Sequence, residues 1–60
     1  MNKALSDKYL EWGSAIVDNF DIDNFDTAIH CFDMAIIYDS EATDAYYWRA
    51  VAQDQVERKR

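Results

Sequence analysis

The sequence predicts an all-α fold, a three-helix antiparallel bundle in one small domain that spans residues 1–60. Three observations lead to this prediction. The chain contains no proline and a single glycine, although these residues usually mark the ends of strands and tight turns. Apolar residues recur at intervals of three and four in three separate stretches, which is typical of amphipathic helices. The stretches between them are short, so neighbouring helices should run antiparallel.

The first helix is predicted over residues 3–19. One apolar helix face recurs at gaps of 4, 3, 4 and 4 residues: Leu5, Tyr9, Trp12, Ile16 and Phe20. Asn2 precedes the helix and is a candidate N-cap. Gly13 lies mid-helix, where glycine costs about 1 kcal/mol relative to alanine. We therefore expect another helix to pass close to Gly13.

A turn is predicted around residues 20–23, because Asp and Asn side chains bond their own backbone and favour turns. Asp23 or Asn24 would then cap the second helix, which is predicted over residues 24–38. The apolar face of this helix consists of Phe25, Ile29, Phe32 and Ile36, flanked by Ala28 and Ala35. The two alanines would allow a neighbouring helix to come close.

The third helix is predicted over residues 41–57, with Ser40 or Thr43 as its cap. It carries two candidate apolar stripes. One consists of Ala45, Trp48, Ala52 and Val56, and the other of Tyr46 and Ala50. Since Tyr46, Tyr47 and Trp48 are consecutive, they cannot all face one core. At least one of these aromatic side chains should therefore reach the surface, where Tyr and Trp are enriched among binding residues.

The net charge of −6 is unevenly distributed, because residues 18–44 contain eight acidic residues and no Lys or Arg. Such a segment should repel nucleic acid and anionic lipid, so we expect neither nucleic-acid binding nor membrane contact. The longest apolar run, residues 34–38, is too short to span a bilayer. Residues 1–7 lack a signal-peptide core, and the lone Cys31 suits a reducing compartment. We therefore expect a cytoplasmic protein, and Met1 and the basic tail favour a complete one.

No residue pattern predicts catalysis, a metal site or a cofactor. An EF-hand that started at any acid of the 18–26 cluster would need a glutamate at its twelfth position, where the sequence has only Ile29, Phe32, Met34 or Ile37. His30 and Cys31 are adjacent, so on a helix they cannot face each other. The chain should therefore be a non-enzyme, and residues 58–60 should form a solubilising basic tail.

The pattern Tyr9-x-x-Trp12-Gly13-x-x-Ile16, followed by Ala28-x-x-x-Phe32, resembles the tetratricopeptide repeat. Asp39-Ser40 stands where the family usually has Asp-Pro, and residues 44–52 look like the first helix of a second repeat. The resemblance covers nearly the whole chain and implies one repeat plus a capping helix. It also implies that three small residues lie where paired helices cross: Gly13, Ala28 and Ala50.

The sequence departs from the family in several places. Tyr9 and Tyr46 are 37 residues apart, whereas the period is about 34. The surplus falls before Ala28, the turn proline is missing, and Arg49 replaces an expected apolar residue. Since roughly three repeats are needed for a stable stack, the chain should pack on copies of itself or on a partner. A three-helix bundle without repeat character is the alternative.

The resemblance implies a protein–protein interaction module, either adaptor-like or self-associating. Its groove would carry Leu10, Ser14 and Val17 from the first helix and Tyr47, Trp48 and Val51 from the third. The carboxylate clamp of some members is absent, because Asp7 and Asp44 occupy matching positions. The alternative is a small acidic inhibitor or nucleic-acid mimic that occupies the basic site of a target through Asp18, Asp21, Asp23, Asp26 and Asp33. A purely structural self-assembling unit is a third possibility, and the acids could simply provide solubility.

Overall fold

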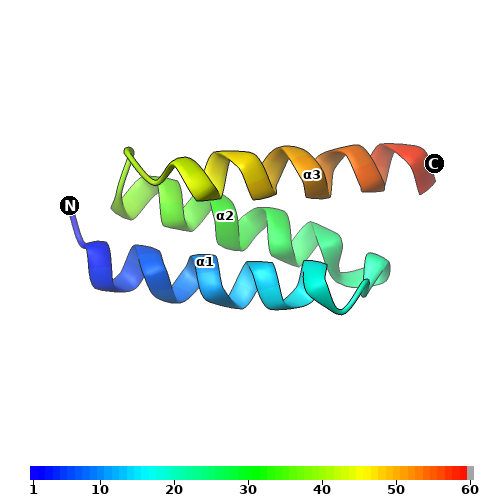
Figure 1. Cartoon of the computed structure of the whole chain (residues 1–60), viewed down its shortest axis with the longest axis horizontal. Coiled ribbons are helices and arrows are strands. Elements are labelled where there is room, and N and C mark those ends of the chain that lie inside the picture. The colour runs from blue at the N-terminus through cyan, green and yellow to red at the C-terminus, as the bar shows by residue number, and fades with distance from the viewer. Residues whose placement is uncertain (60) are drawn as a thin grey trace.

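The computed structural model describes residues 1–59 as three antiparallel α-helices, which run back and forth along the long axis of the molecule (Figure 1). The helices are α1 (Lys3–Asp18), α2 (Phe25–Tyr38) and α3 (Thr43–Lys59), with a short 3₁₀ helix, η1 (Ile22–Asn24), before α2. The predicted all-α, three-helix architecture is confirmed. Arg60 of the predicted basic tail lies outside the described residues.

The middle helix in sequence is also the middle helix in space. Both α1 and α3 pack against α2, and they contact each other much less. In Figure 1, α2 lies behind α1 and α3, so one face of the molecule is formed by the two outer helices together. This arrangement follows from the two short connections, each of which returns the chain along the helix just completed.

The helix bounds agree with the predicted ranges to within two residues, but the caps differ. The Asn2 carboxamide accepts a hydrogen bond from the Leu5 backbone N–H at 3.1 Å, so the predicted cap of α1 is confirmed. Asn24 occupies the N-cap position of α2 but makes no side-chain capping bond. Its Nδ2 instead donates to Asp21 Oδ2 at 2.6 Å, because η1 brings these two side chains to the same side of the turn.

The start of α3 also differs from prediction, because the helix begins at Thr43 rather than at residue 41. Residues 39–42 form the preceding turn, in which the Ala42 N–H donates to the Asp39 carbonyl at 3.1 Å. The Ser40 carbonyl accepts a hydrogen bond from the Tyr46 hydroxyl at 3.1 Å. Ser40 therefore ties the turn to the first turn of α3 through its backbone.

The C-terminus of α1 ends in a left-handed residue that is not glycine. Phe20 has a φ of 53°, its N–H donates to the Val17 carbonyl at 3.0 Å, and the Asp21 N–H donates to the Ile16 carbonyl at 3.3 Å. These two bonds define a Schellman motif, in which glycine usually occupies the left-handed position. The Phe20 side chain is 75% exposed, so burial does not offset the cost of this backbone conformation.

The core is centred on α2 and consists mainly of small and aromatic residues. Its buried cluster contains Val17, Phe25, Ala28, Phe32 and Ala52. Ala35 and Ala45 are also fully buried, so alanines line the contacts of α2 with both neighbours. Short side chains at these positions allow the helix axes to approach closely, and the two phenylalanine rings fill the remaining space.

The helix face that α1 turns to the core is not the apolar stripe that its sequence suggests. The buried residues of α1 are Ser6, Gly13 and Val17. By contrast, Trp12 is 59% exposed, and Leu5, Tyr9 and Ile16 are half-buried. The stripe therefore lies at the side of the α1–α2 contact, because small residues permit a closer helix approach than the aromatic stripe would.

Two small residues of α1 make close contacts with α2. At Gly13, a Cβ atom would lie 2.6 Å from Cε1 and 2.9 Å from Cζ of the fully buried Phe32 ring. The predicted close approach at Gly13 is therefore confirmed. One turn from the start of α1, the buried Ser6 hydroxyl donates to the Ala35 carbonyl at 2.8 Å. The same carbonyl accepts the Asp39 N–H at 2.9 Å, so both helices share one acceptor.

We predict that Gly13→Ala destabilises the protein despite the higher helix propensity of alanine. Overpacking a core costs about 1–3 kcal/mol, whereas the propensity gain is about 1 kcal/mol. The free energy of unfolding, measured by urea denaturation, should fall by up to about 2 kcal/mol. The double variant Gly13→Ala/Phe32→Leu should show a favourable coupling in a double-mutant cycle, because the smaller side chain removes the ring atoms. Stabilisation by Gly13→Ala alone would contradict the close contact.

We predict that Phe20→Gly stabilises the protein, because the left-handed backbone costs a residue with a Cβ about 1 kcal/mol or more. The free energy of unfolding should rise by somewhat less than this cost, because glycine has greater conformational entropy than phenylalanine in the unfolded chain. Phe20→Ala is the matched control, since it removes the ring but retains the Cβ, and it should change stability little. Equal effects of the two variants would show that the backbone is unstrained.

Candidate interaction surface

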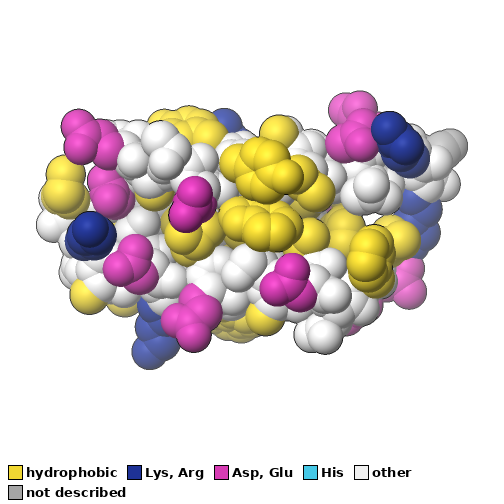
Figure 2. All heavy atoms as spheres, in the orientation of Figure 1, with side chains coloured by type: hydrophobic (Ala, Val, Ile, Leu, Met, Phe, Trp, Pro, Cys, Tyr) yellow, Lys and Arg dark blue, Asp and Glu magenta, His cyan; other side chains and the backbone are white. Residues whose placement is uncertain are grey.

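The residues predicted to form a groove belong to α1 and α3, the two outer helices. We call them together the α1–α3 face, which is defined by Leu10, Ser14, Val17, Tyr47, Trp48 and Val51. Leu10, Ser14 and Val17 follow the 3–4 spacing of one side of α1. On α3, Val51 lies four residues after Tyr47 and three after the adjacent Trp48. Viewed from the side of the two outer helices, apolar side chains gather over α3 and between α3 and α1 (Figure 2).

The residues of the α1–α3 face differ in how much surface they offer. Val17 is 8% exposed and belongs to the core cluster, so it supports the face from below. Leu10, Trp48 and Val51 are half-buried and pack against that cluster. Tyr47 is 64% exposed. The face therefore consists of a tyrosine that projects into solvent and an apolar base that is anchored in the core.

Tyr47 is held in position by Trp48. The two rings meet edge to face, with centroids 5.5 Å apart and planes at 74°. This is a preferred geometry for aromatic pairs, because the positive edge of one ring meets the negative face of the other. An exposed aromatic side chain that is already ordered loses little entropy when a partner binds, which is one reason such residues dominate binding energies.

The opposite side of α3 carries the arginine that departs from the repeat pattern. Arg49 Nη1 lies 2.9 Å from Asp33 Oδ1 on α2, and its guanidinium lies 5.4 Å from the centroid of the Tyr46 ring. Ala50 was expected at a helix crossing but is exposed, because the register that buries Ala45 and Ala52 turns it to solvent. The charged pair thus links α3 to α2 at the edge of their contact.

The predicted acidic surface gathers at the end of the bundle where α1 connects to α2. Asp18, Asp21, Asp23 and Asp26 are exposed, and Asp33 lies further along α2 and is half-buried. Asp23 is paired with Lys59 from the end of α3. The Lys59 ammonium donates a hydrogen bond and attracts the carboxylate, so the pKa of Asp23 lies below its ordinary value.

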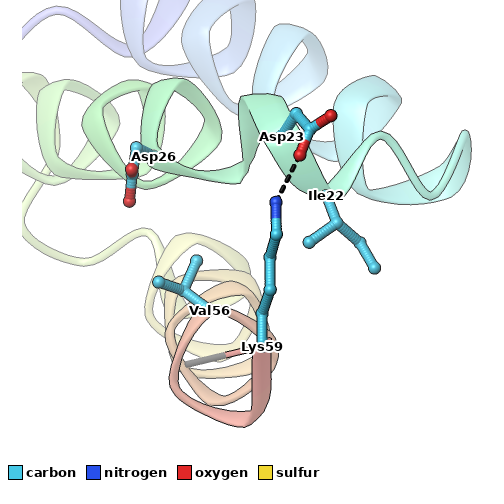
Figure 3. A pocket seen from close by; sticks show the side chains of 5 residues that line it. All are labelled: Ile22, Asp23, Asp26, Val56 and Lys59. Atoms are coloured by element: carbon cyan, nitrogen blue, oxygen red, sulfur yellow. Dashed lines mark hydrogen bonds and ion pairs between the residues drawn. The ribbon is translucent and has the colours of Figure 1, made fainter.

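Beside the Asp23–Lys59 pair is a depression of about 280 Å³ lined by Ile22, Asp23, Asp26, Val56 and Lys59. Figure 3 shows the Lys59 side chain extending from α3 to Asp23 on η1. The Asp26 carboxylate lies on the far side of the depression from Ile22. The ion pair therefore joins the end of α3 to the η1 turn, and part of the acidic surface is neutralised within the chain.

His30 and Cys31 point to different environments. His30 is exposed, whereas Cys31 is 2% exposed, and burial raises the pKa of its thiol. Since the thiolate is the nucleophilic form of cysteine, this environment disfavours reactivity. The buried thiol acts as a small apolar side chain on α2.

Within residues 1–59, no group of three or more His, Cys, Asp and Glu side chains is arranged to hold a metal ion. Nor does any helix in this range combine the length and apolar character needed to cross a membrane. Comparison of the chain with protein-family models, with curated proteins and with solved structures found no match.

We predict that substitutions at the adjacent aromatic residues have different effects on stability. Trp48→Ala should lower the free energy of unfolding by about 1–3 kcal/mol, less than the roughly 3–5 kcal/mol for a fully buried aromatic, because Trp48 is only partly buried. Tyr47→Ala should change it by no more than about 0.5 kcal/mol. Urea denaturation monitored by circular dichroism measures both values. Equal losses would mean that Tyr47 is a structural residue and not an available contact.

Proposed function

We propose that this chain is a non-catalytic protein–protein interaction module that binds a partner chain through its α1–α3 face. The observation that carries the proposal is Tyr47, which is 64% exposed and ordered against Trp48. Trp48 in turn packs on the core. This combination of an accessible aromatic residue and an anchored apolar base is typical of binding hot spots.

We further propose that the helices form one tetratricopeptide-like repeat followed by a capping helix. The positions that carry the sequence resemblance support this proposal. Gly13 meets the Phe32 ring, and Ala28 and Ala35 are fully buried. In such an arrangement, the face shared by the first helix of each repeat is the binding face, which here is the α1–α3 face.

The chemistry of the face favours an apolar or aromatic segment as its ligand. Leu10, Trp48 and Val51 provide apolar area that is partly accessible. Asp7 and Asp44, which the resemblance places along the groove, are exposed and would repel an acidic segment. The exposed His30 and the buried Cys31 thiol support a module without catalytic activity, and a lone thiol suits a reducing cytoplasm.

The acidic surface is the second candidate, in which the chain occupies the basic site of a target protein. The exposure of Asp18, Asp21, Asp23 and Asp26 at one end of the bundle supports this alternative. However, the Asp23 carboxylate is paired with Lys59 and the Asp33 carboxylate with Arg49. These internal pairs reduce the negative charge that the surface presents, so the α1–α3 face is the stronger proposal.

A peptide-display selection against the wild-type chain, followed by affinity measurement, tests the proposal. Tyr47→Ala should weaken binding of the selected peptides by about 2 kcal/mol or more, which is roughly thirtyfold. Ile37→Ala is the matched control, because Ile37 is a 71% exposed apolar residue on α2, and it should leave affinity unchanged. Helicity should be the same in all three proteins.

The salt dependence of binding separates the two candidates. An apolar contact should retain its affinity as the salt concentration rises, whereas binding through the acidic surface should weaken steeply because salt screens charges. The proposal fails if the selected peptides are basic, bind Tyr47→Ala normally and dissociate at moderate salt.

A further inference from the structure

Carboxylates border the α1–α3 face along α1. One line along this helix, at gaps of 4, 3 and 4 residues, consists of Asp7, Glu11, Ser14 and Asp18. Ser14 belongs to the α1–α3 face, and Leu10 beside it packs against the buried core cluster. The three acids are exposed. The apolar base of the face therefore has a negatively charged edge on its α1 side.

A fourth carboxylate lies on α3. Asp44 is exposed and precedes Tyr47 by three residues and Trp48 by four, so it is on the same side of α3 as these two rings. In the view of the two outer helices, acidic side chains lie on both sides of the apolar patch, whereas Lys and Arg side chains lie mainly toward the ends of the molecule (Figure 2). We call Asp7, Glu11, Asp18 and Asp44 the acidic border.

The charge of the acidic border is not balanced by ion pairs within residues 1–59. The pairs in this range join Asp33 to Arg49, Asp54 to Arg58 and Asp23 to Lys59. The lysines of α1, Lys3 and Lys8, form no ion pair with the border. Two lysines also cannot neutralise four carboxylates, so this part of the surface keeps a net negative charge.

Helix α1 gains no stability from its share of the acidic border. Asp18 is the last residue of α1, where the helix dipole disfavours a negative charge. Asp7 and Glu11 are four residues apart, and like charges at this spacing repel each other. Only Asp44, in the first turn of α3, is placed where the dipole favours an acid. Charges that work against local stability are expected at functional sites.

We propose that the segment bound by the α1–α3 face is cationic as well as apolar. An aromatic or aliphatic side chain of the partner packs on Leu10, Trp48 and Val51, and a Lys or Arg side chain lies against the acidic border. The inference rests on the proposed function and names the chemistry of its ligand. From Asp7 to Asp18 the border rises about 16 Å, at about 1.5 Å per residue. An extended peptide of about five residues spans this length, at about 3.3 Å per residue.

The two parts of such a ligand have different roles in binding. Charges at the rim of an interface mainly raise the association rate and select among partners. Apolar contacts at the centre mainly slow dissociation. The carboxylates should therefore add a salt-sensitive increment to an apolar contact that persists when salt screens the charges.

Peptides selected by display from a random library on the wild-type chain test the inference. Those whose binding requires Tyr47 should be enriched in Lys and Arg relative to the library. Asp7→Asn/Asp18→Asn should weaken them about fivefold at low salt, as expected for the loss of two partly exposed ion pairs, mainly through a slower association rate. Asp26→Asn/Glu57→Gln is the matched control, because it changes exposed acids outside the face, and it should alter affinity less than twofold.

The two double variants remove the same charge, since each takes the net charge from −6 to −4. A difference between them therefore reports the position of the carboxylates and not the net charge. Raising the salt concentration should bring wild type and Asp7→Asn/Asp18→Asn to the same affinity. Circular dichroism should show equal helicity in all three proteins, because every substituted residue is exposed.

Two results would overturn the inference and leave the proposed function standing. One is a set of Tyr47-dependent peptides without enrichment in Lys and Arg. The other is an equal loss of affinity in the two double variants, which would show that only net charge matters. A library that yields no Tyr47-dependent peptide would overturn the proposed function, and this inference with it.

Discussion

The absence of a side chain at Gly13 determines how closely α1 approaches α2. The Phe32 ring lies so near this glycine that a Cβ would contact it at 2.6 Å, and Phe32 is completely buried as a result. With the Phe32 ring buried against Gly13, the alanines of α2 and α3 can pack at short range. Phe32 of α2 and Ala52 of α3 belong to the same buried cluster, so α3, which carries Tyr47 and Trp48, packs on a core that includes the Gly13–Phe32 contact.

Much of the fold could be predicted from the sequence because each helix has a long apolar period and each connection is short. The side of α1 that faces the core could not. Its buried residues are Ser6, Gly13 and Val17, and the first two give no apolar signal. Leu5, Tyr9 and Trp12 give a strong apolar signal, although Leu5 and Tyr9 are only half-buried and Trp12 is exposed. A close helix contact favours small residues, so a hydrophobic pattern marks the wrong side where the helices are closest.

Only part of the α1–α3 face and of the acidic surface could be predicted, because local sequence patterns do not show how separate helices are aligned. Three consecutive aromatic residues required that one reach solvent, but the choice of Tyr47 depends on the register of α3 against α2. That register is supported by the Arg49–Asp33 pair, which joins residues from separate helices. The Asp23–Lys59 pair joins residues 36 positions apart, so local sequence could not indicate it. The left-handed Phe20 was missed because glycine is the usual sign of a Schellman motif.

The order in which the helices pack has a consequence for how quickly the chain reaches its folded state. Each of the large helix contacts joins elements adjacent in sequence, so the chain closes only short loops before native contacts form. Helical proteins with such local topology fold in roughly microseconds to milliseconds. This is fast compared with most encounters between proteins at cellular concentrations, where association is slowed by the need for correct orientation. A partner therefore meets an assembled surface, and its rate of capture depends on collision and alignment rather than on the folding of this chain.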